Sequence, residues 1–206
     1  MVQIQKINLK HPDPALIQKA RDYITDGKLV IFPTDTVYGL ATDPFNESAV
    51  KTLLKAKKRD IGKGLPILLG NLDIAQELVE FSNVALSLAT RFWPGALTMV
   101  LPLKKEMLNE VTGNRNTLGI RIPGNRVARE LAKIPIIGTS ANISGQKSPS
   151  TAEEAVNQLG NLVQLVLDGG PSKEGLPSTI IDLSGTQTQL LREGSIKYEE
   201  ILPFLR

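Results

Sequence analysis

The chain alternates between short apolar runs of β-type residues and longer segments whose apolar residues recur at helical spacing. After Asp13-Pro14, for example, apolar residues follow at helical intervals up to Ile24, and Gly27 then closes the pattern. The same reasoning predicts helices that begin at 46 or 48, and over 73–79, 83–93, 127–132 and 150–159, with a last helical turn from 198. Strands are predicted over 2–8, from 30, and over 65–69, 97–103, 117–122, 134–137, 164–167, 179–183 and 189–191. This interleaving predicts one α/β domain around a mixed sheet.

Two predicted strands end abruptly in small polar residues. The run from Val30 to Ala41 turns polar at Thr34-Asp35-Thr36, and the strand before Gly138 ends in Gly-Thr-Ser-Ala-Asn. In an open α/β sheet, ligands bind beyond the strand ends, where the loops diverge into a crevice. An ordinary strand and turn, with Tyr38 in the core, explains the first run equally well.

Composition excludes several kinds of site. The 206 residues contain no Cys, and His11 is the single histidine, so thiolate chemistry, disulfides and a Ser-His-Asp triad are not expected. The N-terminus lacks a secretory apolar region, and no apolar stretch approaches the roughly 20 residues that span a bilayer. We therefore expect a soluble, cytoplasmic protein without membrane contact.

Positive charge is concentrated in one segment, although the net charge is only +3. Residues 51–63 contain several lysines and Arg59, and Asp60 is the one acid among them. Cations at the end of a predicted helix complement its dipole, which is the simpler explanation. The alternative is a phosphate clamp, because Arg offers a planar fork of donors and Lys a point charge. The chain has neither a Walker A motif nor Gly-x-Gly-x-x-Gly.

Hydroxyl-rich and cationic residues also interrupt later strands. The loop after Ser140-Ala-Asn142 leads to Ser150-Thr-Ala-Glu153, which predicts a capping box and a helix start that also suits an anion. Arg121 lies in an apolar run, so it either pairs with an acid or faces a crevice and binds a carboxylate. Ser178 and Arg192 break two further strand patterns, but each is a weak signal alone.

Three motifs in order resemble the YrdC/Sua5 family. They are the Pro-Thr-Asp-Thr-Val-Tyr-Gly-Leu run at 33–40, Lys57-x-Arg59 and Ser140-x-Asn142, and the resemblance extends from about Leu16 to Arg192. It implies a single YrdC-like domain over residues 1–206, with a twisted mixed β-sheet flanked by helices and a basic concave surface. Asp60 departs from the pattern, because proline is common after this arginine, and it leaves a less characterised paralogue branch open.

The resemblance implies the activity of an L-threonylcarbamoyladenylate synthase. Such an enzyme joins L-threonine, bicarbonate and ATP into threonylcarbamoyl-AMP, releases pyrophosphate, and supplies the t6A modification at position 37 of tRNA. The implied threonine-binding residues are Thr34, Arg121, Ser140 and Ser178. The implied ATP-binding residues are Lys57, Arg59, Lys63, Thr117, Asn142, Ser150 and Arg192. The catalytic set is Lys57, Arg59, Ser140 and Asn142.

Neither a Cys nor a His is needed for this reaction. A carbamate that attacks the α-phosphate in line requires positioning and charge neutralisation rather than a covalent nucleophile. Mg²⁺ is expected on the phosphates of ATP, with no metal site of the protein's own. Because the sequence ends soon after Arg192, separate tRNA threonylcarbamoyl-transferase proteins are expected to complete the modification.

Two other functions remain open at this point. A basic concavity could bind RNA phosphates without any reaction, although an aromatic content of 4% leaves few stacking platforms. Weak RNA binding could also accompany the synthase. A related carbamoyl-handling enzyme without threonine specificity is the third interpretation.

Overall fold

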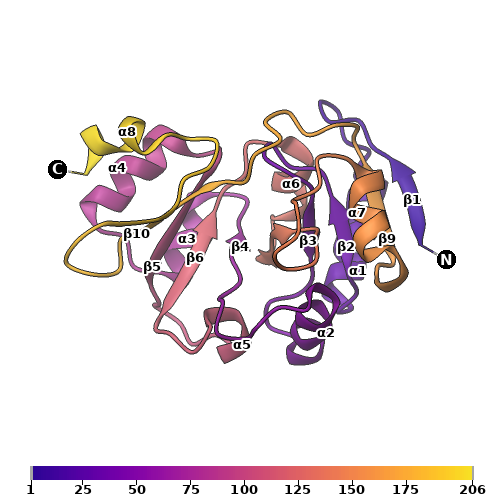
Figure 1. Ribbon diagram of the computed structural model, residues 1–206, viewed down its shortest axis with the longest axis horizontal. Coiled ribbons are helices and arrows are strands. Elements are labelled where there is room, and N and C mark those ends of the chain that lie inside the picture. The colour runs from indigo at the N-terminus through magenta and orange to yellow at the C-terminus, as the bar shows by residue number, and fades with distance from the viewer. Residues whose placement is uncertain (1, 206) are drawn as a thin grey trace.

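The strands form two mixed sheets that lie side by side (Figure 1). The computed structural model describes residues 2–205, so the predicted domain span of 1–206 extends one residue beyond it at each end. The first sheet has the order β1 (Gln3–Lys6), β9 (Leu165–Asp168), β2 (Val30–Phe32), β3 (Gly39–Ala41), β8 (Thr139–Ser140). The second has the order β11 (Gln189–Arg192), β10 (Thr179–Asp182), β5 (Leu97–Pro102), β6 (Thr117–Arg121), β4 (Ile67–Leu68), β7 (Ile136–Ile137). Parallel and antiparallel pairs occur in both.

One short segment belongs to both sheets. β7 is an edge strand of the second sheet and β8 an edge strand of the first, and only Gly138 separates them. A Cβ at Gly138 would lie 2.1 Å from Cγ of Leu68, so a side chain there would collide with β4. Glycine therefore lets the chain cross between the sheets at close range.

Helices cover both faces of the first sheet. α1 (Pro14–Thr25) and α6 (Arg126–Leu131) share one apolar cluster with Val30 and Phe32, whereas α2 (Glu47–Lys57) and α7 (Ala152–Leu159) share another with Ile31. Successive side chains of β2 point to opposite faces of the sheet, so the strand contributes to both apolar clusters. α7 lies in front of this sheet in Figure 1 and α1 behind it.

The second sheet is covered on one face. α3 (Leu72–Leu78), α4 (Asn83–Phe92) and α8 (Tyr198–Ile201) pack there on the buried Leu97, Met99 and Leu101 of β5. The alternate residues of β5, Thr98 and Val100, point to the opposite face and line a cavity. The remaining short elements are α5 (Asn109–Thr112) and the 3₁₀ turns η1 (Gly160–Leu162) and η2 (Leu202–Phe204).

The α/β prediction is confirmed, and several of its details differ. The expected single sheet is divided in two. Between the predicted strands over 97–103 and 117–122, where no periodicity predicts an element, the structure has the one-turn helix α5. The predicted capping box is displaced by one residue, because Thr151 is the N-cap and its hydroxyl accepts from the N–H of Glu154 at 3.2 Å. Over residues 2–205, none of the helices combines the length and apolarity needed to cross a bilayer.

Candidate active site

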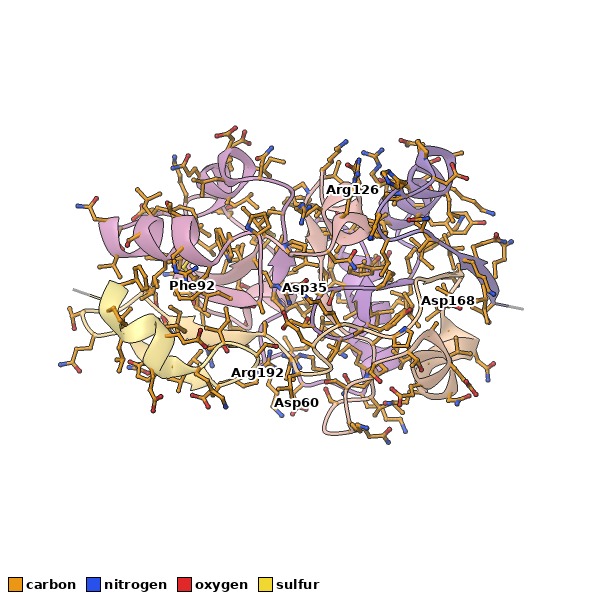
Figure 2. All side chains as sticks on the ribbon, turned by 90° about the horizontal axis from the view of Figure 1, so that it is seen from above. Asp35, Asp60, Phe92, Arg126, Asp168 and Arg192 are labelled. Carbon is orange, nitrogen blue, oxygen red and sulfur yellow. The ribbon has the colours of Figure 1, made fainter. Side chains whose placement is uncertain are left out.

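A cavity of about 220 Å³ lies between the two sheets. The first sheet and its turns contribute Thr34, Tyr38 and Ser140, and the exposed face of the second sheet contributes Thr98 and Thr117. Seen from above, Asp35 and Arg192 lie in the middle of the molecule, between Phe92 on one side and Asp168 on the other (Figure 2). The cavity therefore lies where the polar strand ends of one sheet meet the uncovered face of the other.

Four arginines line this cavity: Arg59, Arg115, Arg121 and Arg192. None of the described residues that line it is an Asp or a Glu. Burial lowers the pKa of Arg59, and burial followed by the charges of Arg121 and Arg59 lowers the pKa of Arg192. Cations gathered at such a place favour an anionic ligand, because an anion relieves their mutual repulsion.

Two of these arginines are held by backbone carbonyls. Arg59 follows the end of α2, where Lys58 adopts a left-handed conformation, and its Nε and Nη2 donate to the carbonyls of Lys63 (3.0 Å) and Gly64 (2.9 Å). Arg192 donates from Nε and Nη2 to the carbonyl of Ser178, at 3.0 and 2.9 Å. Each guanidinium carries five N–H donors, so both retain donors for a ligand.

Arg121 pairs with an acid and also faces the cavity, so these two features, which its sequence context gives as alternatives, occur together. Its Nη2 pairs with Oδ1 of Asp35 at 2.5 Å, and the residue also lines the cavity. Its Nε donates to the carbonyl of Gly95 at 2.8 Å, and its Nη1 donates to the hydroxyl of Thr36 at 3.0 Å. The guanidinium is therefore anchored on three sides.

The hydroxyl residues predicted to bind threonine reach the same cavity. Thr34 is buried, and its hydroxyl donates to the carbonyl of Val37 at 2.6 Å, which fixes the turn after β2. The Ser178 hydroxyl lies 2.9 Å from that of Thr98 and accepts from Nη2 of Arg192 at 3.2 Å. Ser140, in β8, lines the cavity beside them.

Tyr38 is a core residue whose hydroxyl also holds the segment between β9 and β10. It is fully buried, and its hydroxyl donates to the carbonyl of Gly170 at 2.6 Å while accepting from the N–H of Gly169 at 3.1 Å. Burial raises its pKa to about 12. The segment between β9 and β10, which runs from one half of the molecule to the other in Figure 1, is thus tied to the turn that holds Thr34.

Lys57 does not line the cavity. The phosphate clamp predicted for the basic segment requires side chains that leave the helix end toward solvent, and for Lys57 this is wrong, since it is 1% exposed. Its Nζ donates to the carbonyls of Ser140 and of Asn142, the latter at 2.8 Å, and its own carbonyl accepts from the N–H of Ser144 at 2.7 Å. Lys57 therefore fixes the backbone of the Ser-x-Asn motif from behind.

Three further predicted residues lie outside the cavity lining. Lys63 is exposed, with Nζ 3.8 Å from a carboxylate oxygen of Asp60. The Asn142 amide donates to two carbonyls of its own loop, and the Ser150 hydroxyl donates to the Glu154 carboxylate at 3.0 Å. The predicted residues that do share the cavity are Thr34, Arg59, Thr117, Arg121, Ser140, Ser178 and Arg192.

Sequence reasoning missed Arg115 and Thr98. Arg115 comes from the segment 104–116, which lacks the periodicity that would have placed it. For Thr98 a signal did exist: it is the polar member of the alternating Leu-Thr-Met-Val-Leu run of β5.

The burial of Lys57 predicts that the stability of the protein depends on pH. Burial, followed by the charge of Arg59, lowers its pKa from 10.5 to about 7. Between these two values the unfolded chain binds a proton that the folded protein does not, so stability should rise with pH across this window, by up to about 1.4 kcal/mol per pH unit. Urea denaturation of the wild type and of Lys57→Met at several pH values measures this. A difference between the two proteins that stays constant from pH 7 to pH 10 would contradict it.

The fold and the cavity define an α/β protein with an arginine-lined cavity between two sheets. The profile of the Sua5/YciO/YrdC family, described as "Telomere recombination", matches residues 22–194. The chain belongs to this family, as its motifs predicted.

Similar proteins bear related names. The threonylcarbamoyl-AMP synthase of Pyrococcus abyssi is 39% identical over 189 residues, which cover 90% of this chain and 56% of that protein. A putative threonylcarbamoyl-AMP synthase of Mycobacterium tuberculosis is 40% identical over 88% of this chain and 85% of its own length. A crystal structure of P. abyssi Sua5 complexed with L-threonine superposes with a TM-score of 0.93 at 36% identity and covers 98% of this chain and 60% of that one. The chain thus spans little more than half of the Pyrococcus protein.

Proposed function

We propose that the protein is a threonylcarbamoyl-AMP synthase, which converts L-threonine, bicarbonate and ATP into threonylcarbamoyl-AMP and pyrophosphate. The observation that carries this proposal is the cavity in which Arg59, Arg121 and Arg192 converge with small hydroxyl residues and without a carboxylate. The names of its relatives, and the threonine complex of one structural neighbour, support the same activity.

The reaction fits the residues that are present. Bicarbonate supplies CO₂ with loss of water, and the amine of threonine takes up the CO₂ as a carbamate and loses a proton. The carbamate oxygen then attacks the α-phosphorus of ATP while the bond to the β-phosphate breaks and pyrophosphate leaves. Negative charge on the phosphates is what the enzyme must stabilise, and fixed guanidinium groups in a cavity serve that purpose. Because the cavity lining offers no carboxylate to a metal, Mg²⁺ would enter as part of the substrate, bound to the phosphates.

Within this proposal, threonine binds at Thr34, Arg121, Ser140 and Ser178, and ATP binds at Arg59, Thr117 and Arg192. The cavity is smaller than the roughly 300–1,000 Å³ of sites that hold drug-sized ligands, so the nucleotide extends beyond it. Lys63, Asn142 and Ser150, which lie outside the lining, are then candidates for contacts with the outer part of ATP. Lys57 acts through the backbone of Ser140 and Asn142.

Release of pyrophosphate from ATP tests the proposal most directly. The purified protein is incubated with Mg-ATP, L-threonine and bicarbonate, and each substrate is omitted in turn. Release that requires both threonine and bicarbonate is the expected result. Release that persists without threonine would favour a carbamoyl-handling enzyme with another acceptor, and no release at all would favour an RNA-binding module.

The preference for threonine over serine should be limited. The two amino acids differ by one methyl group, and such a contact discriminates by about 1–3 kcal/mol, or roughly 10- to 200-fold. Serine is thus expected to be a poor but measurable substrate, and glycine a worse one because it leaves any hydroxyl partner unpaired. Comparison of kcat/KM for the three amino acids measures this, and equal values would refute a dedicated threonine pocket.

We further propose that separate tRNA threonylcarbamoyl-transferase proteins use the product, in the cytoplasm where tRNA is found. The labile adenylate must meet the adenine acceptor in a second site that positions both. Adding unmodified tRNA to the complete reaction should leave the tRNA unmodified until a transferase system is supplied. Modification by this protein alone would contradict that division of roles.

A further inference from the structure

Asp35 and Thr36 lie in the turn that joins β2 to β3, and the proposed function gives neither of them a role. Asp35 does not line the cavity, and its side chain is 12% exposed, beside an Arg121 side chain that is 7% exposed. Both residues of the turn contact the same guanidinium, Asp35 through Oδ1 and Thr36 through its hydroxyl. Asp35 approaches Arg121 from outside the cavity lining, whereas Thr36 also lines the cavity beside the guanidinium.

The hydrogen bonds of Arg121 can be counted. A guanidinium has five N–H donors. One donates to Gly95, one to Thr36 and one to Asp35, which leaves one N–H on each Nη nitrogen. Each of these N–H groups can donate to an oxygen of a carboxylate ligand.

The Asp35 carboxylate has little freedom to move. Its Oδ2 is buried and has no hydrogen-bond partner within residues 2–205, and a Cβ at Gly124 would lie 2.9 Å from it. The backbone on either side is held as well, because the carbonyls of Asp35 and Thr36 accept from the N–H groups of Glu174 (3.2 Å) and Gly175 (3.0 Å). The fold thus holds the carboxylate in place, and the carboxylate in turn holds the guanidinium of Arg121.

We propose that Asp35 and Thr36 are positioning residues that aim the two remaining N–H groups of Arg121 at the carboxylate of the amino-acid substrate. This inference rests on the proposed function. The negative charge of Asp35 by itself repels a carboxylate, so its contribution is orientation. An uncharged acceptor of the same shape should therefore preserve it.

Binding of L-threonine and of L-threoninamide, which replaces the carboxylate by a neutral amide, separates orientation from general damage. Dissociation constants are measured by calorimetry for the wild type, Asp35→Ala, Asp35→Asn and Thr36→Val, with Asp26→Asn as the control because Asp26 forms an exposed ion pair with Lys28. Circular dichroism shows which variants fold, and pyrophosphate release is recorded in parallel.

The ratio of the two dissociation constants is the readout. We expect the wild type and the control to bind threonine at least about tenfold more tightly than threoninamide, a charge-assisted contact of ordinary strength. Asp35→Ala and Thr36→Val should bring the ratio toward one. Asp35→Asn should retain most of it, because the amide oxygen still accepts from Nη2 of Arg121. A merely structural role would weaken both ligands equally and leave the ratio unchanged.

Each result decides between the inference and the function on which it rests. A folded Asp35→Ala with the wild-type ratio overturns the inference, and Thr36→Val decides it in the same way if Asp35→Ala does not fold. A wild type that releases pyrophosphate but does not discriminate the two ligands overturns the inference alone. The expected ratios without pyrophosphate release support the inference and overturn the synthase. No threonine binding by the wild type overturns both.

Discussion

Replacing Arg121 by alanine is expected to lower the free energy of unfolding by about 3–5 kcal/mol, because it leaves the Asp35 carboxylate buried without its partner. The carbonyl of Gly95 and the hydroxyl of Thr36 lose their donor at the same time. Urea denaturation measures the change. Arg91→Ala, which removes an exposed arginine of α4, serves as the control and should stay within about 0.5 kcal/mol of the wild type.

The double variant Asp35→Ala/Arg121→Ala identifies the cause. When both charges are removed, no ion is left uncompensated, so the double variant should be more stable than Arg121→Ala alone. A double variant that loses the sum of the two single losses would show that the pair is not coupled. A loss below about 1 kcal/mol in Arg121→Ala would show that water reaches Asp35 and solvates it.

Lys57→Met is expected to reduce synthase turnover by about 100-fold, because the backbone of Ser140 and Asn142 shifts when its donor is lost, and small misplacements of reacting groups have effects of this size. Two buried carbonyls would lack a partner, so stability should also fall by about 2–4 kcal/mol. Methionine keeps the length of the side chain and isolates the loss of the donor. Turnover at saturating substrates and urea denaturation measure the two effects.

Lys55→Met is the matched control, since Lys55 is an exposed residue of the same last turn of α2. It should leave both quantities close to the wild type. Normal turnover in a folded Lys57→Met would show that the Ser-x-Asn loop keeps its position without the lysine.

Local signals predicted the elements well, and long-range contacts account for the differences. Asp13 and Asn46 cap α1 and α2 as the sequence indicates, because a cap depends on residues two or three positions away. Lys57 was misplaced because its acceptors, Ser140 and Asn142, lie 83 and 85 residues further along the chain. At the end of a helix, an exposed lysine and a buried one look alike in a sequence.

The sequence indicated which kinds of residue gather at the candidate site, but it did not indicate which of them contact each other. Seven of the predicted residues line one cavity. Which acid pairs with Arg121 could not be derived, because Asp35 is 86 residues away and other acids are as plausible by composition. Neighbouring hydroxyls caused the same difficulty at Ser150 and Thr151, since either can begin a capping box. The division into two sheets follows from strand pairing, which periodicity does not report.

The order of strands in the first sheet has a consequence for how the protein is made. β9 lies between β1 and β2, so residues 165–168 supply one partner of β2 and, within residues 2–205, the sole partner of β1. A nascent chain shorter than this holds β1 without a neighbour and β2 with one free edge, and unpaired edges invite pairing with other chains. The sheet that carries the Thr34 turn is therefore completed late in synthesis, and chains truncated before residue 165 should need a chaperone to remain unaggregated.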